Sequence, residues 1–122
     1  ELKTSPYPYC LEIFDPRVMG IVRQQAPEVL RGQLADSYQS YRGIGVKAVP
    51  AFVFSHCLGN VLGRPDFIAW CPDERNWAVR LCAALGAMMV MWTALPEHDT
   101  EKLEKDYDGV IFQWYAPKPK YK

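Results

Sequence analysis

Apolar runs separated by capping and turn residues divide the first part of the sequence into short elements. Cys10 to Phe14 is an apolar run around one acid and predicts a strand. Asp15 and Pro16 follow as an N-cap and a first helical residue, and the apolar stripe that ends before Pro27 predicts a helix. Val29 to Leu34 is apolar at its ends and predicts a second strand. The chain therefore opens as strand, helix, strand.

The same alternation returns later in the chain. Phe67 to Trp70 is a compact apolar run that predicts a strand, and Asp73 is expected to cap a helix that Gly86 stops. Ala87 to Trp92 is continuously apolar, as expected for a strand buried on both faces. Five apolar side chains of the intervening helix are predicted to face inward: Trp77, Val79, Leu81, Cys82 and Leu85.

Between these two parts, Ala35 to Arg64 carries a weaker pattern. Its first half is polar and punctuated by glycine, and its second half, AFVFSHCLGNVL, fits either a buried helix or an irregular apolar segment. Crowded apolar residues in this segment also allow contact with lipid or with a partner.

Near the C-terminus, Pro96 begins a charged stretch that predicts a helix through about Tyr107, and Val110 to Phe112 predicts the last strand. Residues 116–122 form a polar, proline-bearing tail. The alternation of strands with helices predicts an α/β fold with about five parallel strands and outer helices. Periodicity alone leaves an open sheet and part of a closed barrel as alternatives.

Composition limits the size and the class of the protein. With 122 residues, the chain suits one domain over residues 1–122, and 49% hydrophobic and 23% charged residues exclude a disordered or coiled-coil protein. Its 14 basic and 14 acidic residues cancel, so no overall positive field attracts nucleic acid, and no nucleic-acid partner is expected.

The four cysteines form no C-x-x-C pair, and Cys57 and Cys82 lie inside apolar stretches. We therefore expect reduced thiols and a cytoplasmic location. The longest apolar stretch, Val46 to Leu62, is interrupted by polar residues, and the first residues lack the pattern of a signal peptide. No transmembrane segment is expected.

Four blocks of the sequence, taken together and in order, resemble the glycerophosphodiester phosphodiesterase family. They read LEIFDPRVMGIVRQQAPEVLRGQL, LGRPDFIAW, NWAVRLCAALGAMMVMWT and YDGVIFQ, and the resemblance covers residues 10–115. The family's fold is a (β/α)8 TIM-type barrel, and the blocks resemble its C-terminal part, about strands four to eight. The resemblance therefore implies a partial barrel, and a family reaction that hydrolyses glycerophosphodiesters to glycerol 3-phosphate and an alcohol.

The parts of the family that carry its chemistry do not occur in this sequence. In the family, strands one to three supply a His-Arg-Gly motif, an acidic pair, a second histidine and a glutamate, which bind a divalent metal (Mg²⁺ or Ca²⁺) and provide acid and base. Phosphodiester cleavage needs this charge neutralisation and a positioned acid. We therefore assign no catalytic residue and no metal ligand to this chain, and expect it to bind no metal and to be inactive alone.

Three side chains are candidates for substrate binding. Trp92 resembles the aromatic residue with which the family packs the glycerol side of the substrate, although a core tryptophan is the alternative. Phe14 carries over in the same way, and Glu12 lies either toward the barrel mouth or at an exposed strand end. Where the family commonly has a serine this chain has Ile13, and where relatives often carry an acid after the last strand it has Gln113.

A sheet of five strands leaves open edges and an exposed apolar inner face, so the expected partners are a second copy or a complementing N-terminal barrel half. A glycerophosphodiester-type small molecule is a further expected ligand. A non-catalytic, dimeric binding or structural protein derived from the same fold is the alternative function. A cysteine-based hydrolase has little support, because adjacent Ser55, His56 and Cys57 do not make a catalytic group by adjacency alone. The inner face is predicted to carry Ile13, Ile68, Met89, Met91 and Ile111.

Overall fold

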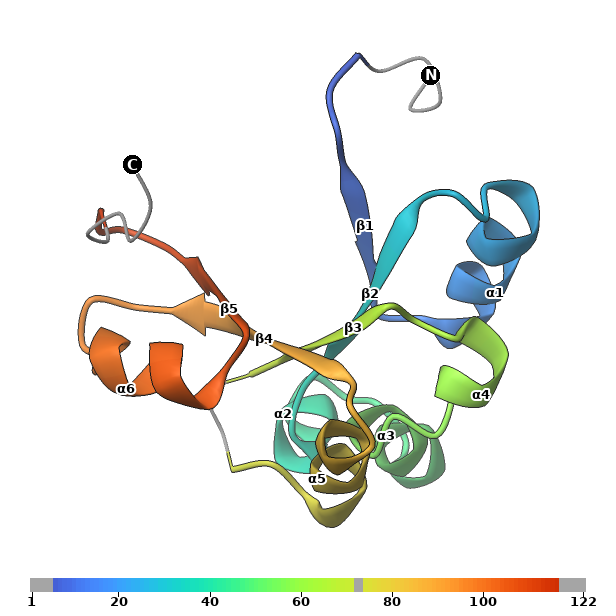
Figure 1. Cartoon of the computed structure of the whole chain (residues 1–122). Helices are drawn as coiled ribbons and strands as arrows, with labels where there is room; N and C mark the ends of the chain where they lie inside the picture. Colours follow the sequence, from blue (N-terminus) through green and yellow to red (C-terminus); the bar gives the residue numbers. More distant parts are fainter. Residues whose placement is uncertain (1–5, 72–73, 117–122) are drawn as a thin grey trace.

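Five parallel strands form one sheet in the computed structural model of the chain, which describes residues 6–71 and 74–116. The strands lie in sequence order, so each connection is a crossover that carries helix to the outside of the sheet. The sheet curls, and the helices cover its convex side (Figure 1), so the predicted partial barrel is confirmed as a half-barrel. The strands are β1 (Cys10–Ile13), β2 (Leu30–Ala35), β3 (Phe67–Trp70), β4 (Met88–Ala94) and β5 (Gly109–Phe112).

Three helices follow the predicted connections between strands. The first, α1, spans Pro16–Gln25, and Asp15 caps it by accepting a hydrogen bond from the backbone N–H of Arg17. The second, α5, spans Trp77–Ala84, and the third, α6, spans Thr100–Asp106. The prediction that the last helix begins at Pro96 is wrong, because the Asp99 side chain accepts from the backbone N–H of Lys102 and sets the N-cap later.

The segment between β2 and β3 folds into three short helices on the convex side of the sheet. These are α2 (Tyr38–Gly43), α3 (Ala48–Ser55) and α4 (Asn60–Gly63). The side chain of Ser37 accepts a hydrogen bond from the backbone N–H of Ser40 and caps α2, whereas α3 begins without a side-chain cap. The polar first half of the segment thus forms α2, and the apolar second half forms α3 and α4.

The main core lies between the sheet and the helices. Ile68 of β3 and Met89 of β4 are almost fully buried there, in one cluster with Val79 of α5 and Cys57. Strand register places Ile13, Ile68 and Met89 on the same face, and Met91 follows two residues after Met89.

The prediction that Ile13, Ile68, Met89 and Met91 line the inner face of the barrel is therefore wrong. A continuously apolar strand has no period-two signal, so its sequence does not tell which residues face the helices. Strand pairing instead places three rows of neighbouring residues on the concave face. The first row contains Leu30, the second contains Glu12, Gly32, Phe67 and Met88, and the third contains Leu34, Ala69 and Val90.

Two further predictions for α5 are wrong. The helix cap is Asn76, whose side chain accepts from the backbone N–H groups of Ala78 and Val79; the predicted cap, Asp73, lies outside the described residues. Three side chains predicted to face inward are instead mostly exposed: Trp77, Leu81 and Leu85. Residues spaced four apart share one helix face, and here that face is directed away from the sheet.

In the described part of the chain, no helix is long and apolar enough to cross a membrane. Within the same residues, β1 pairs only with β2, and β5 only with β4. The half-barrel therefore has two open edges and an uncovered concave face (Figure 1).

Candidate functional site

The carboxyl ends of the five strands meet at one edge of the half-barrel, the edge at which barrel enzymes carry their sites. A cavity of about 410 Å³ opens at this edge. Its lining consists of Ser40 of α2 and of residues that end or directly follow four of the strands: Asp36, Cys71, Trp92, Thr93, Leu95, Gln113 and Trp114. We call this the mouth cavity.

Trp92 and Phe14 form an aromatic pair beside the mouth cavity. Their ring centroids are 5.5 Å apart and their planes cross at 75°, an edge-to-face arrangement. The indole Nε1 of Trp92 donates a hydrogen bond of 3.3 Å to the carbonyl oxygen of Ala35 at the end of β2. Two of the three residues predicted to bind substrate are thus brought together from β4 and from the residue after β1.

Gln33 fixes the turn that presents Phe14. Its side chain is 3% exposed, and its Nε2 donates to the carbonyl oxygens of Phe14 at 2.8 Å, Leu34 at 2.9 Å and Ile13 at 3.2 Å. One amide therefore ties the end of β1 to β2. Gln33 was not among the predicted site residues, although a glutamine in an otherwise apolar strand is a signal, because a buried polar group needs a partner.

Glu12 lies apart from this pair. It does not line the mouth cavity, and strand register places it opposite Gly32, in the same row of the concave face as Phe67. A Cβ atom at Gly32 would overlap the ring of Phe67, so glycine there allows the ring to lie against the sheet. Partial burial raises the pKa of Glu12 above its usual value of 4.5. Glu12 is nevertheless an exposed residue, and it lies on β1 two residues before Phe14.

Asp36 supplies the one carboxylate that lines the mouth cavity among the described residues. It directly follows β2, and its Oδ1 accepts a hydrogen bond of 2.6 Å from the backbone N–H of Ser37. Asp36 was also not among the predicted site residues. The signal available was its position, because an acid that follows a barrel strand lies at the edge where function is expected.

Tyr41 and Cys57 lie buried behind this edge and stay protonated near neutral pH. Burial, with a smaller effect from the Asp36 carboxylate, raises the pKa of Tyr41 to about 12. Burial likewise raises the pKa of Cys57 to about 12, so its thiol does not supply a thiolate nucleophile. The hydroxyl of neighbouring Ser55 is 3.0 Å from Nδ1 of His56, but Ser55 is fully buried on the convex side, away from the mouth cavity.

Arg31 and Asp66 mark the opposite end of the strands. The backbone N–H of Arg31 donates to Oδ2 of Asp66 at 2.8 Å, and its guanidinium donates to the carbonyl oxygens of Pro27 and Val29. The guanidinium also forms a 3.3 Å ion pair with Asp66. Arg31 thus joins the beginnings of β2 and β3, at the end of the barrel strands that serves stability rather than function.

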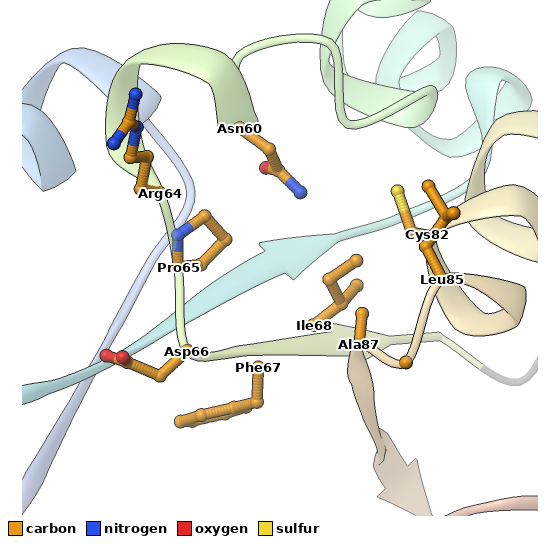
Figure 2. Close-up of a pocket in the computed structure, with 10 residues that line it drawn as sticks. Asn60, Arg64, Pro65, Asp66, Phe67, Ile68, Cys82, Leu85 and Ala87 are labelled. Atoms are coloured by element: carbon orange, nitrogen blue, oxygen red, sulfur yellow. The ribbon is translucent and has the colours of Figure 1, made fainter.

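A second cavity, of about 440 Å³, lies at this amino end between α4 and α5 (Figure 2). Ile68 and Phe67 point to opposite sides of β3 there, with Ile68 toward Cys82 and Ala87 (Figure 2). Its remaining lining comes mainly from the ends of the two helices, including Asn60, Arg64 and Leu85. We call this the α4–α5 cavity.

Across residues 6–71 and 74–116, no group of three His, Cys, Asp or Glu side chains lies close enough together to hold a metal ion. The described residues therefore do not by themselves fit the divalent metal that the family resemblance implies, because Mg²⁺ and Ca²⁺ need several oxygen ligands.

Comparisons with protein-family models, curated proteins and solved structures found no match to this chain.

Proposed function

We propose that this chain forms the C-terminal half of a glycerophosphodiester phosphodiesterase-like barrel and contributes the substrate-binding wall of its site. In this proposal, Phe14 and Trp92 bind the glycerol side of a glycerophosphodiester. The metal ligands, acid and base come from a complementing N-terminal half. The family reaction yields glycerol 3-phosphate and an alcohol, and the 122-residue chain alone is inactive. A cytoplasmic location is part of the same proposal, supported by four cysteines that are all thiols.

The observation that carries the proposal is the aromatic pair at the carboxyl edge of a parallel half-barrel. An edge-to-face pair exposes ring faces and edges to the mouth, where the carbon atoms of a glycerol group can pack. The polar groups of Asp36, Ser40 and Gln113 line the adjoining cavity and can hydrogen bond hydroxyl groups. This combination suits a small polyol better than a flat apolar ligand.

The open concave face supports a partner that completes the barrel. Leu30 and Met88 lie on this face and are 57% and 53% exposed, and Phe14 at its rim is 45% exposed. Full burial of an exposed side chain of this size contributes about 1.5–3 kcal/mol, and these side chains are about half exposed, so covering each one stabilises an assembly by about 1 kcal/mol. Either a second copy or an N-terminal half-barrel can provide the cover. A compact monomer in sedimentation velocity at micromolar concentration would argue against both.

A non-catalytic, dimeric binding protein is the second candidate. The mouth cavity has a single described carboxylate and the polar side chains of Ser40, Thr93 and Gln113. This lining favours the second candidate, since such a site can bind a polyol without cleaving it. It predicts ligand binding without turnover in every metal condition.

A diesterase assay distinguishes the two candidates. The purified chain is assayed on glycerophosphocholine alone and after mixing with an N-terminal half of a glycerophosphodiester phosphodiesterase barrel, each with and without Mg²⁺ and Ca²⁺. We expect hydrolysis only in the mixture, lowered at least tenfold by Trp92→Ala. Trp77→Ala is the matched control, because Trp77 is exposed and lies outside the mouth cavity.

Two results would contradict the first candidate in different ways. Hydrolysis by the chain alone refutes its inactivity. A mixture that assembles but hydrolyses nothing, while the chain alone binds glycerol 3-phosphate in calorimetry, favours the binding protein.

A further inference from the structure

Charge in the mouth cavity has a single sign. Among the described residues that line the cavity, Asp36 carries the only charge, and none of them is a lysine, an arginine or a histidine. The Asp36 side chain is half-buried directly after β2, where its Oδ1 accepts a hydrogen bond of 2.6 Å from the backbone N–H of Ser37. A cleft lined by charge of one sign attracts the opposite sign. The mouth cavity therefore favours a cation over an anion.

Two indole side chains lie in the same lining, those of Trp92 on β4 and of Trp114 after β5. Nε1 of Trp92 donates at 3.3 Å to the carbonyl oxygen of Ala35, so this indole lies beside the residue that directly precedes Asp36. Trp114 is 78% exposed, so the protein core does not occupy its ring and a ligand can contact it. A carboxylate and two aromatic side chains thus meet in one cavity.

The backbone of Trp114 is held in an unfavourable conformation. Its φ is 64°, in the left-handed region that a bulky side chain rarely adopts. The preceding residue is tied to β4, because the backbone N–H of Gln113 donates to the carbonyl oxygen of Ala94 at 3.0 Å. Backbone strain of this kind is concentrated at functional sites. An exposed tryptophan held in this way at a cavity therefore indicates contact with a ligand rather than a role in packing.

These features select among the parts of a small ligand. A phosphate group is bound by cations, and the described lining holds none, so the phosphate of a diester lies outside the cavity. A quaternary ammonium group is bound by aromatic faces, is attracted by a carboxylate and needs no hydrogen-bond acceptor. A neutral alcohol of the same size fills the same space but gains nothing from the charge of Asp36. The lining therefore suits a quaternary ammonium group best.

We propose that the mouth cavity binds a quaternary ammonium group, with the carboxylate of Asp36 as its counter-charge and the rings of Trp92 and Trp114 against its methyl groups. The inference rests on the proposed function for the rest of the ligand. A glycerophosphodiester whose alcohol is choline places this group in the cavity and its glycerol side on Phe14, and Trp92 borders both parts. Free choline offers the same chemistry, and the experiment separates the two sources.

Isothermal titration calorimetry of the full chain tests the inference with two probes of the same shape. Choline carries the charge, and neohexyl alcohol is its neutral counterpart, with carbon in place of nitrogen. We expect choline to bind roughly tenfold more tightly, and this advantage to shrink as salt rises. Tighter binding of glycerophosphocholine than of choline identifies the diester as the source of the group, whereas equal or tighter binding of choline identifies the free alcohol.

Substitution of Asp36 tests the charge. Asp36→Asn keeps the size of the side chain and the acceptor for the N–H of Ser37. It is expected to weaken choline binding roughly fivefold without changing the binding of neohexyl alcohol. Asp99→Asn is the matched control, because asparagine also caps a helix and Asp99, the cap of α6, lies outside the lining of the mouth cavity. This control is expected to bind choline normally.

Substitution of Trp114 tests the rings. Trp114→Leu keeps an apolar side chain but removes the aromatic face, and it is expected to weaken choline binding roughly fourfold, whereas Trp114→Phe keeps most of the affinity. Trp77→Leu is the control, since Trp77 is exposed and does not line the mouth cavity. Circular dichroism verifies folding, and Asp36→Asn provides the test if Trp114→Leu does not fold.

Three results overturn the inference: no binding of choline, equal affinities for choline and neohexyl alcohol, or unchanged choline binding in both Asp36→Asn and Trp114→Leu. Failure of the proposed function gives a different result. If the chain binds choline but its mixture with an N-terminal half hydrolyses nothing, the inference stands and the diesterase is refuted. If the mixture hydrolyses glycerophosphocholine and glycerophosphoglycerol with equal kcat/KM, the diesterase stands and the inference is refuted.

Discussion

Replacing Gln33 by leucine tests whether one buried amide holds the mouth together. In the folded chain its Nε2 serves three backbone carbonyl oxygens at 2.8–3.2 Å. Leucine has a similar volume but no donor, so the substitution leaves the carbonyl groups of Ile13 and Phe14 without this partner beside an apolar group. The turn after β1, and with it Phe14, loses its tie to β2.

The expected cost follows from the number of hydrogen bonds that one amide can make. An NH₂ group carries two protons, so about two full hydrogen bonds are lost, and each buried acceptor left unpaired costs about 1–3 kcal/mol. Gln33 is 3% exposed, so water does not readily replace the amide. Leucine also removes the buried Oε1 of Gln33, which has no hydrogen-bond partner in the described part of the chain, and this offsets part of the cost. We expect the free energy of unfolding to fall by about 1–3 kcal/mol, a large fraction of the stability of an ordinary domain.

Urea unfolding followed by far-UV circular dichroism measures this change. All samples are compared at one protein concentration, because association makes stability depend on concentration. The matched control is Gln39→Leu, an exposed glutamine on α2, which is expected to change the free energy of unfolding by less than about 0.5 kcal/mol. A weaker near-UV signal from the Phe14–Trp92 pair is the second expected effect. If Gln33→Leu unfolds like its control, the assigned role of the amide is incorrect.

Three further predictions concern other parts of the half-barrel. The pKa of Glu12 is raised in the folded chain by partial desolvation, so the folded state binds its proton more tightly, and stability falls as pH rises from 4.5 through the raised value. Glu12→Gln is expected to remove this part of the pH dependence in urea titrations, and an unchanged profile would show that the carboxyl group is not desolvated in the folded chain. Asn76→Ala is expected to cost about 1–3 kcal/mol in thermal unfolding, because it removes the cap of α5 and the bond to Ser55, whereas Asn76→Asp, which keeps the cap acceptor, is expected to cost less. Gly32→Ala is expected to lower the free energy of unfolding by about 1–3 kcal/mol, because the ring of Phe67 must move to make room for the new methyl group. Combining it with Phe67→Leu is expected to recover part of this loss, whereas additive effects of the two substitutions would show that the residues are not in contact.

The order of the five strands and of α1, α5 and α6 was predictable from the sequence because each signal for it is local, whereas the three helices between β2 and β3 were not predicted individually. The run FIAW marks β3 by itself, and Asp15 with Pro16 marks the start of α1, since capping and proline geometry depend on neighbouring residues only. Right-handed crossovers then make the strands parallel, and the resemblance selected a barrel over an open sheet. Trp92 and Phe14 were assigned to the site through that resemblance, and the structure places their rings together.

The directions in which side chains face were decided only by the tertiary structure. Apolar runs such as AMMVMW are compatible with either face of a sheet, so Met89 was assigned to the wrong one. The stripe on α5 was read as a buried face, because amphipathic spacing identifies an apolar face but not what covers it. Gln33 and Asp36 belong to the site because β1, β2 and β4 end at the same edge of the half-barrel. They could not be predicted from the sequence, because a contact between residues far apart in the chain has no local signal.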